Sequence, residues 1–125
     1  MSEPRFSTLT PETMTTDQKR VADAIQSGPR GAGLRGPFNA LLRSPELCEK
    51  VEALGAYCRF ESSLPLRLRE MALLIASRHF DAQYSWNAHV DKAVEAGVDR
   101  EAIARLGRGE EPKFRRPPRE QRAAG

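Results

Sequence analysis

The stretch of sequence that decides the fold runs from residue 70 to residue 89 and reads EMALLIASRHFDAQYSWNAH. Residues 71–76 (MALLIA) are apolar all round when placed on a helix, so we expect this helix to be buried on most of its sides. Asp81 can cap a second helix, and Gly97 is a typical helix stop. Because short connections make neighbouring helices antiparallel, the stretch predicts a helical hairpin.

The segments on both sides of this hairpin also carry helix boundaries. Thr15 and Gln18 match a capping box, and Ser44 followed by Pro45 is a typical helix start. No segment shows the strict alternation of a half-buried strand, so the sequence predicts an all-α fold with five helices. These helices are expected to start at Thr15, Ser44, Ser63, Asp81 and Val98-Asp99, and their expected stops include Ser27-Gly28-Pro29, Gly97 and Gly107. Val98 and Ile103 are placed to form a hydrophobic staple at the first turn of the last helix. In addition, a short helix is expected at 37–42.

One of the expected helices carries an apolar stripe and both cysteines. Leu47, Val51, Leu54 and Cys58 recur at spacings of four, three and four residues, which makes this helix amphipathic. Cys48 and Cys58 are ten residues apart, which on one helix is about 15 Å along the axis and too far for a disulfide. The sequence has no CxxC motif and no zinc-type cluster, so we expect structural thiols and no metal site.

The length and charge of the chain restrict its partners. Its 125 residues fit one domain, and 39% apolar residues predict a modest core that burial at an oligomer interface could supplement. The net charge of +3 comes entirely from residues 107–125, which hold six Lys/Arg and three Glu. A Pro/Arg-rich tail of this kind is typical of a solvated segment, so we expect no nucleic-acid partner.

No apolar run is long enough for a membrane span, and no secretory signal is visible behind Met1. We therefore expect no membrane partner and a cytoplasmic location. The expected organisation is an extended arm at 1–14, one all-α domain at 15–107 and a flexible Pro/Arg-rich tail at 108–125.

Most of the residues capable of chemistry lie within the hairpin. Glu70 lies on the helix expected to be buried, where a carboxylate needs a partner because burial disfavours its charged form. Ser85 and His89 are four residues apart and share one helix face. With the turn near Asp81, the heights of Glu70 and His89 along the hairpin differ by about 4–5 Å, which a Glu side chain or one water can bridge. Such a pair can transfer protons near neutral pH.

Structural explanations stay open for the same residues. A His on a helix that also carries Tyr84 and Trp86 is often a packed interior residue, and Glu70 is close in sequence to several arginines with which it can form an ion pair. His79 lies at a helix end, where interaction with the helix dipole explains it.

A set of segments then identifies the chain as similar to a known family. They are Gly28-Pro29-Arg30-Gly31, Gly36-Pro37-Phe38-Asn39-Ala40-Leu41-Leu42, Ser44-Pro45, Leu54-Gly55-Ala56-Tyr57-Cys58-Arg59-Phe60, Arg69-Glu70, Tyr84-Ser85-Trp86-Asn87-Ala88-His89 and Ala96-Gly97-Val98. In this order and spacing, over most of residues 20–113, they resemble the carboxymuconolactone decarboxylase family, which shares its fold with the alkylhydroperoxidase D-type proteins.

The resemblance implies an all-α, alkylhydroperoxidase D-like fold around an antiparallel helical hairpin, and assembly as a homo-oligomer, a trimer or hexamer. It also implies acid–base chemistry on a small lactone or carboxylic acid, with no metal and no organic cofactor. The residue roles that follow are His89 as proton carrier, Glu70 as its orienting partner, Ser85 and Tyr84 as hydrogen-bonding groups, Arg78 as carboxylate anchor and Trp86 as a packing residue at the substrate site.

The chain departs from the family pattern at two positions. In the peroxidase branch a CxxC pair lies between the Glu and the His, and its two cysteine positions fall on Ala82 and Ser85. Neither can form a thiolate, so dithiol peroxide reduction is not expected. Many relatives also have Glu where this chain has Ser85, so a carboxylate beside His89 is missing.

We therefore expect a carboxymuconolactone decarboxylase-family protein that acts as a cofactor-free carboxy-lyase on a small-molecule substrate. Two alternatives stay open. One is an alkylhydroperoxidase or peroxiredoxin-type antioxidant activity, and the other is a non-catalytic helical oligomer that binds a small ligand.

Overall fold

The computed structural model describes residues 3–31 and 33–113 and is all-helical over these residues, which confirms the predicted fold class. It contains six α-helices, which are the five expected ones and the short helix expected at 37–42, and one π-helix, with no strand in the described ranges. The chain divides between Ser63 and Leu64 into two compact units. The domain ranges expected from the sequence stay predictions, and most of the expected tail lies outside the described residues.

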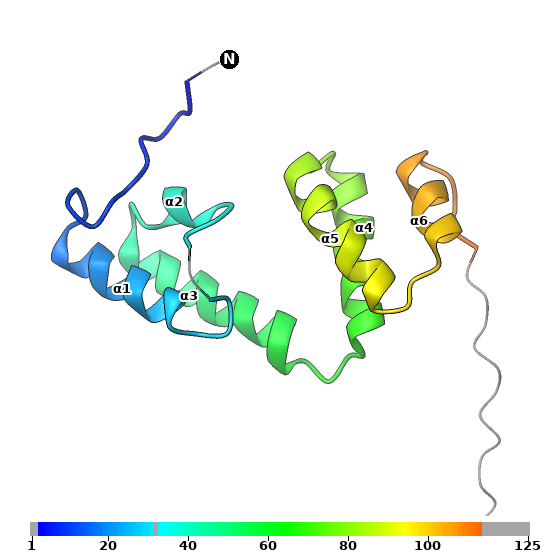
Figure 1. Ribbon diagram of the computed structural model, residues 1–125, viewed down its shortest axis with the longest axis horizontal. Coiled ribbons are helices and arrows are strands. Elements are labelled where there is room, and N and C mark those ends of the chain that lie inside the picture. The colour runs from blue at the N-terminus through cyan, green and yellow to red at the C-terminus, as the bar shows by residue number, and fades with distance from the viewer. Residues whose placement is uncertain (1–2, 32, 114–125) are drawn as a thin grey trace, which may run out of the picture. The chain divides into compact units, whose positions relative to one another are not determined.

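The first unit contains α1 (Thr16–Gln26), α2 (Phe38–Leu41), α3 (Pro45–Ala56) and the π-helix η1 (Tyr57–Glu61). The capping box at the start of α1 is confirmed, since Gln18 N donates to Thr15 Oγ1 at 3.2 Å and Thr15 N donates to Gln18 Oε1 at 2.9 Å. α1 and α2 both pack against α3 (Figure 1). The core of this unit consists of Val21, Ala22, Ile25, Leu42 and Cys48.

A buried ion pair ties the glycine-rich loop of the first unit to α3. Arg30 Nε lies 2.5 Å from Glu52 Oε2, and both side chains are more than four-fifths buried. The Arg30 guanidinium also lies over the rings of Phe38 and Phe60, at 5.2 and 5.8 Å from their centroids. A Cβ atom on Gly55 would lie only 2.8 Å from an Arg30 nitrogen. The guanidinium of Arg30 therefore fits against α3 because residue 55 has no side chain.

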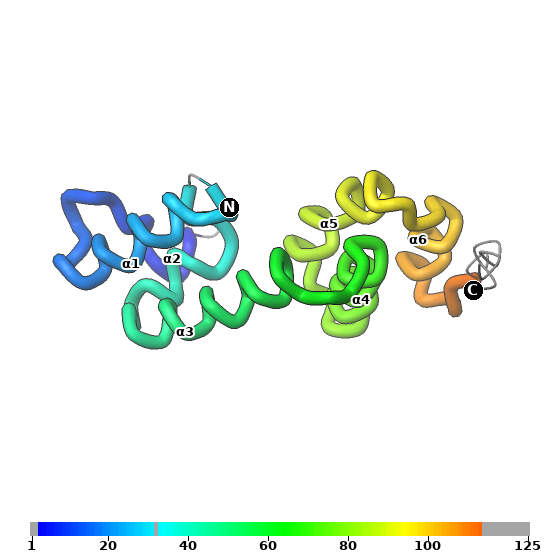
Figure 2. Tube along the Cα trace, turned by 90° about the horizontal axis from the view of Figure 1, so that it is seen from below, coloured from blue at the N-terminus to red at the C-terminus, as the bar shows by residue number. Residues whose placement is uncertain are grey.

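The second unit contains α4 (Leu66–His79), α5 (Gln83–Glu95) and α6 (Arg100–Gly107). α4 and α5 form the predicted hairpin, and α6 packs on α4 (Figure 2). Val98 and Ile103 are both buried on either side of the N-cap Asp99, which agrees with the predicted staple. The core consists of Met71, Leu74, Ala93, Val98, Ile103 and Leu106, with Trp86, Val90 and Val94 packed against it.

The turn between α4 and α5 is a Schellman motif, and the prediction that Asp81 caps α5 is wrong. Asp81 has a left-handed φ of +50°, Ala82 N donates to the Ser77 carbonyl at 2.8 Å, and Asp81 N donates to the Arg78 carbonyl at 3.3 Å. Asp81 thus ends α4. The N-cap of α5 is Ala82, which makes no side-chain cap bond.

Two other helix starts differ from the sequence prediction. α4 begins at Leu66 with Pro65 as its N-cap, so the start expected at Ser63 is wrong. The residue before a proline avoids the helical region, which keeps Leu64 out of the helix. Ser44 is the N-cap of α3 and Pro45 its first residue, as predicted, but the Ser44 side chain makes no cap hydrogen bond.

The expectation that α4 is buried on most sides is also wrong for this chain. Glu70, Met71, Leu74 and Ser77 are buried, but they form one face of α4. Ile75 on another face is 46% exposed, because α5 and α6 supply packing for only part of the helix surface. The apolar stripe of α3 is exposed as well, and the core of the first unit uses Cys48 instead.

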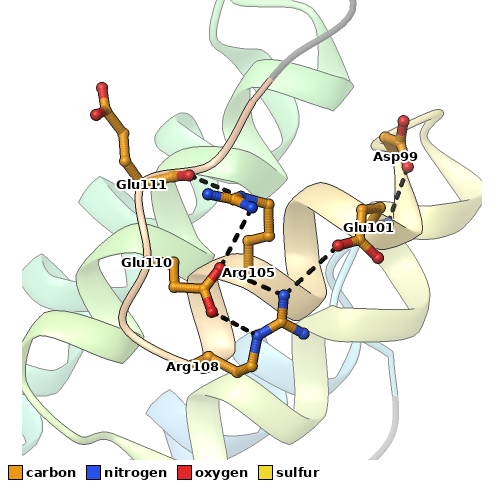
Figure 3. Close-up of polar contacts among 6 residues, drawn as sticks. All are labelled: Asp99, Glu101, Arg105, Arg108, Glu110 and Glu111. Atoms are coloured by element: carbon orange, nitrogen blue, oxygen red, sulfur yellow. Dashed lines mark hydrogen bonds and ion pairs between the residues drawn. The ribbon is translucent and has the colours of Figure 1, made fainter.

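The end of α6 is held by a group of charged side chains, shown in Figure 3. Arg108 Nε donates to Glu110 Oε1 at 2.8 Å, and Arg105 Nε donates to the Glu111 carbonyl at 3.0 Å. Arg108 also lies 3.5 Å from Glu101, in the first turn of the same helix. These contacts fix the chain just after α6 against the helix. No helix in the described residues is long and apolar enough to cross a membrane.

Candidate functional site

The structure brings Glu70 of α4 and His89 of α5 into direct contact. His89 Nδ1 lies 2.7 Å from Glu70 Oε2, which is hydrogen-bond distance. Only 4% of the Glu70 side chain and 14% of the His89 side chain are exposed. The predicted geometry is confirmed, because the helical repeat on the two arms of the hairpin sets both residues at similar heights.

This contact determines which nitrogen of His89 is available for chemistry. An ionised carboxylate can only accept a hydrogen bond, so with Glu70 ionised the proton of this contact belongs to Nδ1. Nε2 of the neutral ring is then a proton acceptor, and the contact between Nδ1 and Glu70 fixes the orientation of the ring. Burial makes the pair interdependent, since a buried carboxylate without a partner is unfavourable. The arrangement can accept a proton at one defined atom and return it.

None of the other predicted site residues forms a hydrogen bond to this pair in the described part of the chain. Ser85 is half-buried one turn before His89, and within the described part of the chain its hydroxyl forms no hydrogen bond. Tyr84 is 63% exposed. Arg78 and Trp86 meet instead at a separate pocket.

That pocket lies where the C-terminal end of α4, the start of α5 and the end of α6 come together. Its volume is about 260 Å³, and its lining residues are Ser77, Arg78, Asp81, Ala82, Gln83, Trp86 and Gly107. Arg78 and Trp86 were predicted as site residues from the sequence, and the other lining residues were not. Ser77 could have been found, because it lies seven residues after Glu70 and so on the same face of α4.

The described residues offer neither a dithiol nor a metal cluster at these places. Cys48 lies in the core of the first unit, where burial raises the pKa of its thiol, and Cys58 is an exposed residue of η1. Residues 82 and 85, where the resemblance leads us to expect the cysteines of a peroxidase, are Ala and Ser. No group of three or more potential metal ligands occurs among the residues that the structure describes.

Over the described residues the chain is thus all-helical, and its helical hairpin holds a buried Glu against a His. A family model described as the carboxymuconolactone decarboxylase family matches residues 45–112, more than half of the chain, and the chain belongs to this family. The match extends from the start of α3 beyond the end of α6 and includes both Glu70 and His89. Comparison with curated proteins and with solved structures gives no match.

Proposed function

We propose that this protein is a cofactor-free lyase that performs acid–base chemistry on a small lactone or carboxylic acid. The observation that carries the proposal is the 2.7 Å contact between Glu70 and His89 in a nearly buried position. Membership of the carboxymuconolactone decarboxylase family supports the reaction class.

In the proposed reaction His89 Nε2 transfers the proton. As a carboxylated lactone loses CO2, the bond between the ring carbon and the carboxylate breaks, and its electron pair is delocalised through the ring double bond into the conjugated lactone carbonyl. A protonated His89 then gives its Nε2 proton to a carbon of the resulting enolate, and His89 regains a proton from solvent. Glu70 is the positioning residue, since its contact with Nδ1 orients the imidazole.

The remaining predicted residues have binding roles in this proposal. Arg78 anchors the carboxylate of the substrate, Ser85 and Tyr84 offer hydrogen bonds, and Trp86 provides an apolar wall. We also propose that the working form is a homo-oligomer, because the exposed stripe of α3 presents apolar surface to solvent.

The test is the His89→Gln variant, assayed for CO2 release with carboxymuconolactone as the probe. Gln keeps a hydrogen-bond donor toward Glu70 but cannot act as a proton carrier at neutral pH. We expect turnover to be abolished while the Tm stays within a few degrees of the parent. If activity and thermal stability fall together, or if turnover survives, His89 has a structural role and the proposal is wrong.

A second candidate function is binding of a small ligand without turnover by a helical oligomer. Two points favour it: position 85, where the resemblance leads us to expect a carboxylate, is a Ser, and the pocket of about 260 Å³ does not include the Glu70–His89 pair among its lining residues. Saturable binding by the parent protein in the absence of any turnover would support this candidate over the lyase.

A peroxidase function has less support, because it requires thiols that the hairpin lacks. Peroxide consumption by the Cys48→Ser/Cys58→Ser double variant separates the cases. Activity that survives in that variant would exclude every thiol route.

A further inference from the structure

The pocket at the end of the hairpin is a site distinct from the Glu70–His89 pair. Ser77 lies two helical turns beyond Glu70, and Ala82 lies two turns before His89, which places the pocket about 10 Å along the hairpin from the pair. A role for this pocket therefore has to be argued from its own residues.

The guanidinium of Arg78 is held at this pocket but keeps much of its bonding capacity. Arg78 Nε donates to the Gly107 carbonyl at 3.2 Å, and a terminal nitrogen donates to Asp81 Oδ1 at 2.9 Å. An arginine has five N–H donors, so three remain without a partner among the described residues. The contact with Gly107 fixes the orientation of the Arg78 guanidinium, and the unused N–H donors can form hydrogen bonds to a carboxylate.

The Arg78–Asp81 ion pair is a weak one. The Asp81 side chain is 85% exposed and the Arg78 side chain 39% exposed, and ion pairs with this exposure contribute little in water. Asp81 is also the left-handed residue of the Schellman turn, whose backbone hydrogen bonds do not involve the ion pair, so the turn can persist when the Asp81 carboxylate leaves Arg78. A carboxylate from solution that also contacts the pocket wall would therefore compete well with Asp81.

The rest of the lining fits a small, partly apolar anion. Trp86 supplies an aromatic surface, and Ser77 and Gln83 carry polar groups that make no side-chain hydrogen bond to the described residues. α5 starts beside the pocket without a side-chain cap, so the positive end of its dipole also favours negative charge there. A volume of about 260 Å³ is below the range of drug-sized sites.

We propose that this pocket binds a small organic carboxylate on Arg78, and that the Asp81 carboxylate is an internal competitor which the ligand displaces. Asp81 occupies one donor of Arg78 in the empty pocket and leaves it when the ligand binds. Removing the charge of Asp81 then strengthens ligand binding, whereas removing the fork of Arg78 weakens it. The inference rests on the proposed function, in which Arg78 anchors the substrate carboxylate, but binding can be tested without turnover, since neither Glu70 nor His89 lines the pocket.

Trp86 makes the proposal directly measurable, because it is the single Trp of the chain and lines the pocket. We would titrate the full chain with sodium benzoate and with uncharged benzamide, and follow the Trp fluorescence. Benzoate should bind saturably. Asp81→Asn should lower its Kd about two- to five-fold, which corresponds to the usual strength of an exposed ion pair. Arg78→Gln should raise the Kd at least about ten-fold, as expected for loss of a charge-assisted fork.

Matched controls separate this effect from net charge and from misfolding. Asp17→Asn removes the same charge from another i,i+3 pair, Asp17–Arg20 at 2.8 Å, and should leave the Kd of benzoate unchanged. Asn tolerates the left-handed region, so Asp81→Asn should keep its circular dichroism spectrum. Arg78→Lys, which keeps the charge without the fork, provides a second variant if Arg78→Gln does not fold.

The proposal is overturned by any of three results. These are the absence of saturable benzoate binding in both the parent and Asp81→Asn, equal affinity in the parent and the folded Arg78 variants, or no tightening in Asp81→Asn. Benzamide binding that responds to these variants as benzoate does would also overturn it. The same titration on His89→Gln should give the parent Kd, so a failed lyase proposal and a failed carboxylate site give different results.

Discussion

At the scale of single residues, the Glu70–His89 contact is a matter of stability as well as chemistry. Removing the partner of a buried carboxylate leaves that carboxylate unpaired, at a cost of about 3–5 kcal/mol. We expect His89→Leu to lower the free energy of unfolding by roughly this amount, because Glu70 is almost fully buried. His89→Gln, which keeps a donor, should cost much less. Urea unfolding measures both.

The matched control for that prediction is the double variant Glu70→Leu/His89→Leu. With both polar groups gone, no carboxylate remains unpaired, and the double variant should be more stable than His89→Leu alone. Additive losses would contradict the interpretation, because they would mean that the two residues do not depend on each other.

The two cysteines should differ sharply in reactivity. Cys48 is fully buried, and burial, followed by the charges of Glu52 and Glu49, raises the pKa of its thiol. Cys58 is exposed. Titration of the native protein with a thiol-specific reagent such as DTNB should therefore detect one fast thiol, and a second only after unfolding in urea. Cys58→Ser should remove the fast reaction, and a fast thiol that persists in this variant would disprove the assignment.

The contacts of a residue could be predicted from the sequence only where residues close to it in the chain determine them. Glu70 and His89 could be paired from the sequence, because the helical repeat alone sets their heights on the hairpin. The binding partner of Arg78 could not, since it depends on the left-handed turn at Asp81 and on where the end of α6 packs. Neither feature leaves a periodic pattern in the sequence.

At the scale of elements, α3 and the loop before it are coupled through one glycine. Gly→Ala inside a helix normally stabilises by about 1 kcal/mol. At Gly55 the new Cβ would lie 2.8 Å from an Arg30 nitrogen and would displace the guanidinium from Glu52 and the two Phe rings. We expect Gly55→Ala to destabilise the protein by about 1 kcal/mol or more, measured by urea unfolding, since a buried pair is lost.

The control is the same substitution in an Arg30→Ala background. There the clash is absent, so Gly55→Ala should raise the free energy of unfolding by the ordinary helix propensity, about 1 kcal/mol. A change of sign between the two backgrounds is the expected result. The same sign in both would show that Arg30 is not what requires glycine at position 55.

Helix boundaries could likewise be predicted where a few adjacent residues determine them, and not where the backbone of the turn decides. The Thr15 capping box and the stop at Gly97 were predicted, because both are hydrogen-bonding or conformational properties of a few adjacent residues. Asp81 was assigned to the wrong helix, since an Asp between two helices suits an N-cap and a left-handed C-terminal residue alike. The backbone hydrogen bonds of the turn decide between them.

At the scale of the whole molecule, the all-α class followed from the sequence but the division at Ser63 and Leu64 did not. Periodicity reports which face of a helix is apolar, not what covers that face. On α3 the regular stripe predicted an amphipathic helix, and in the structure Leu47, Val51 and Leu54 on that stripe are 51%, 40% and 66% exposed. The core of the first unit instead lies on the side of Cys48.

An exposed stripe with this spacing is suited to packing between copies of the chain. If the proposed homo-oligomer uses it, Leu47→Gln/Leu54→Gln should yield a monomer in sedimentation velocity, where the parent forms a trimer or hexamer. Both side chains are exposed in the single chain, so the substitutions should leave the monomer folded, with unchanged helical circular dichroism. Glu46→Gln, on the polar surface of α3, is the matched control and should assemble like the parent. A parent protein that stays monomeric at every concentration, or a double variant that still assembles, would show that the stripe does not hold the subunits together.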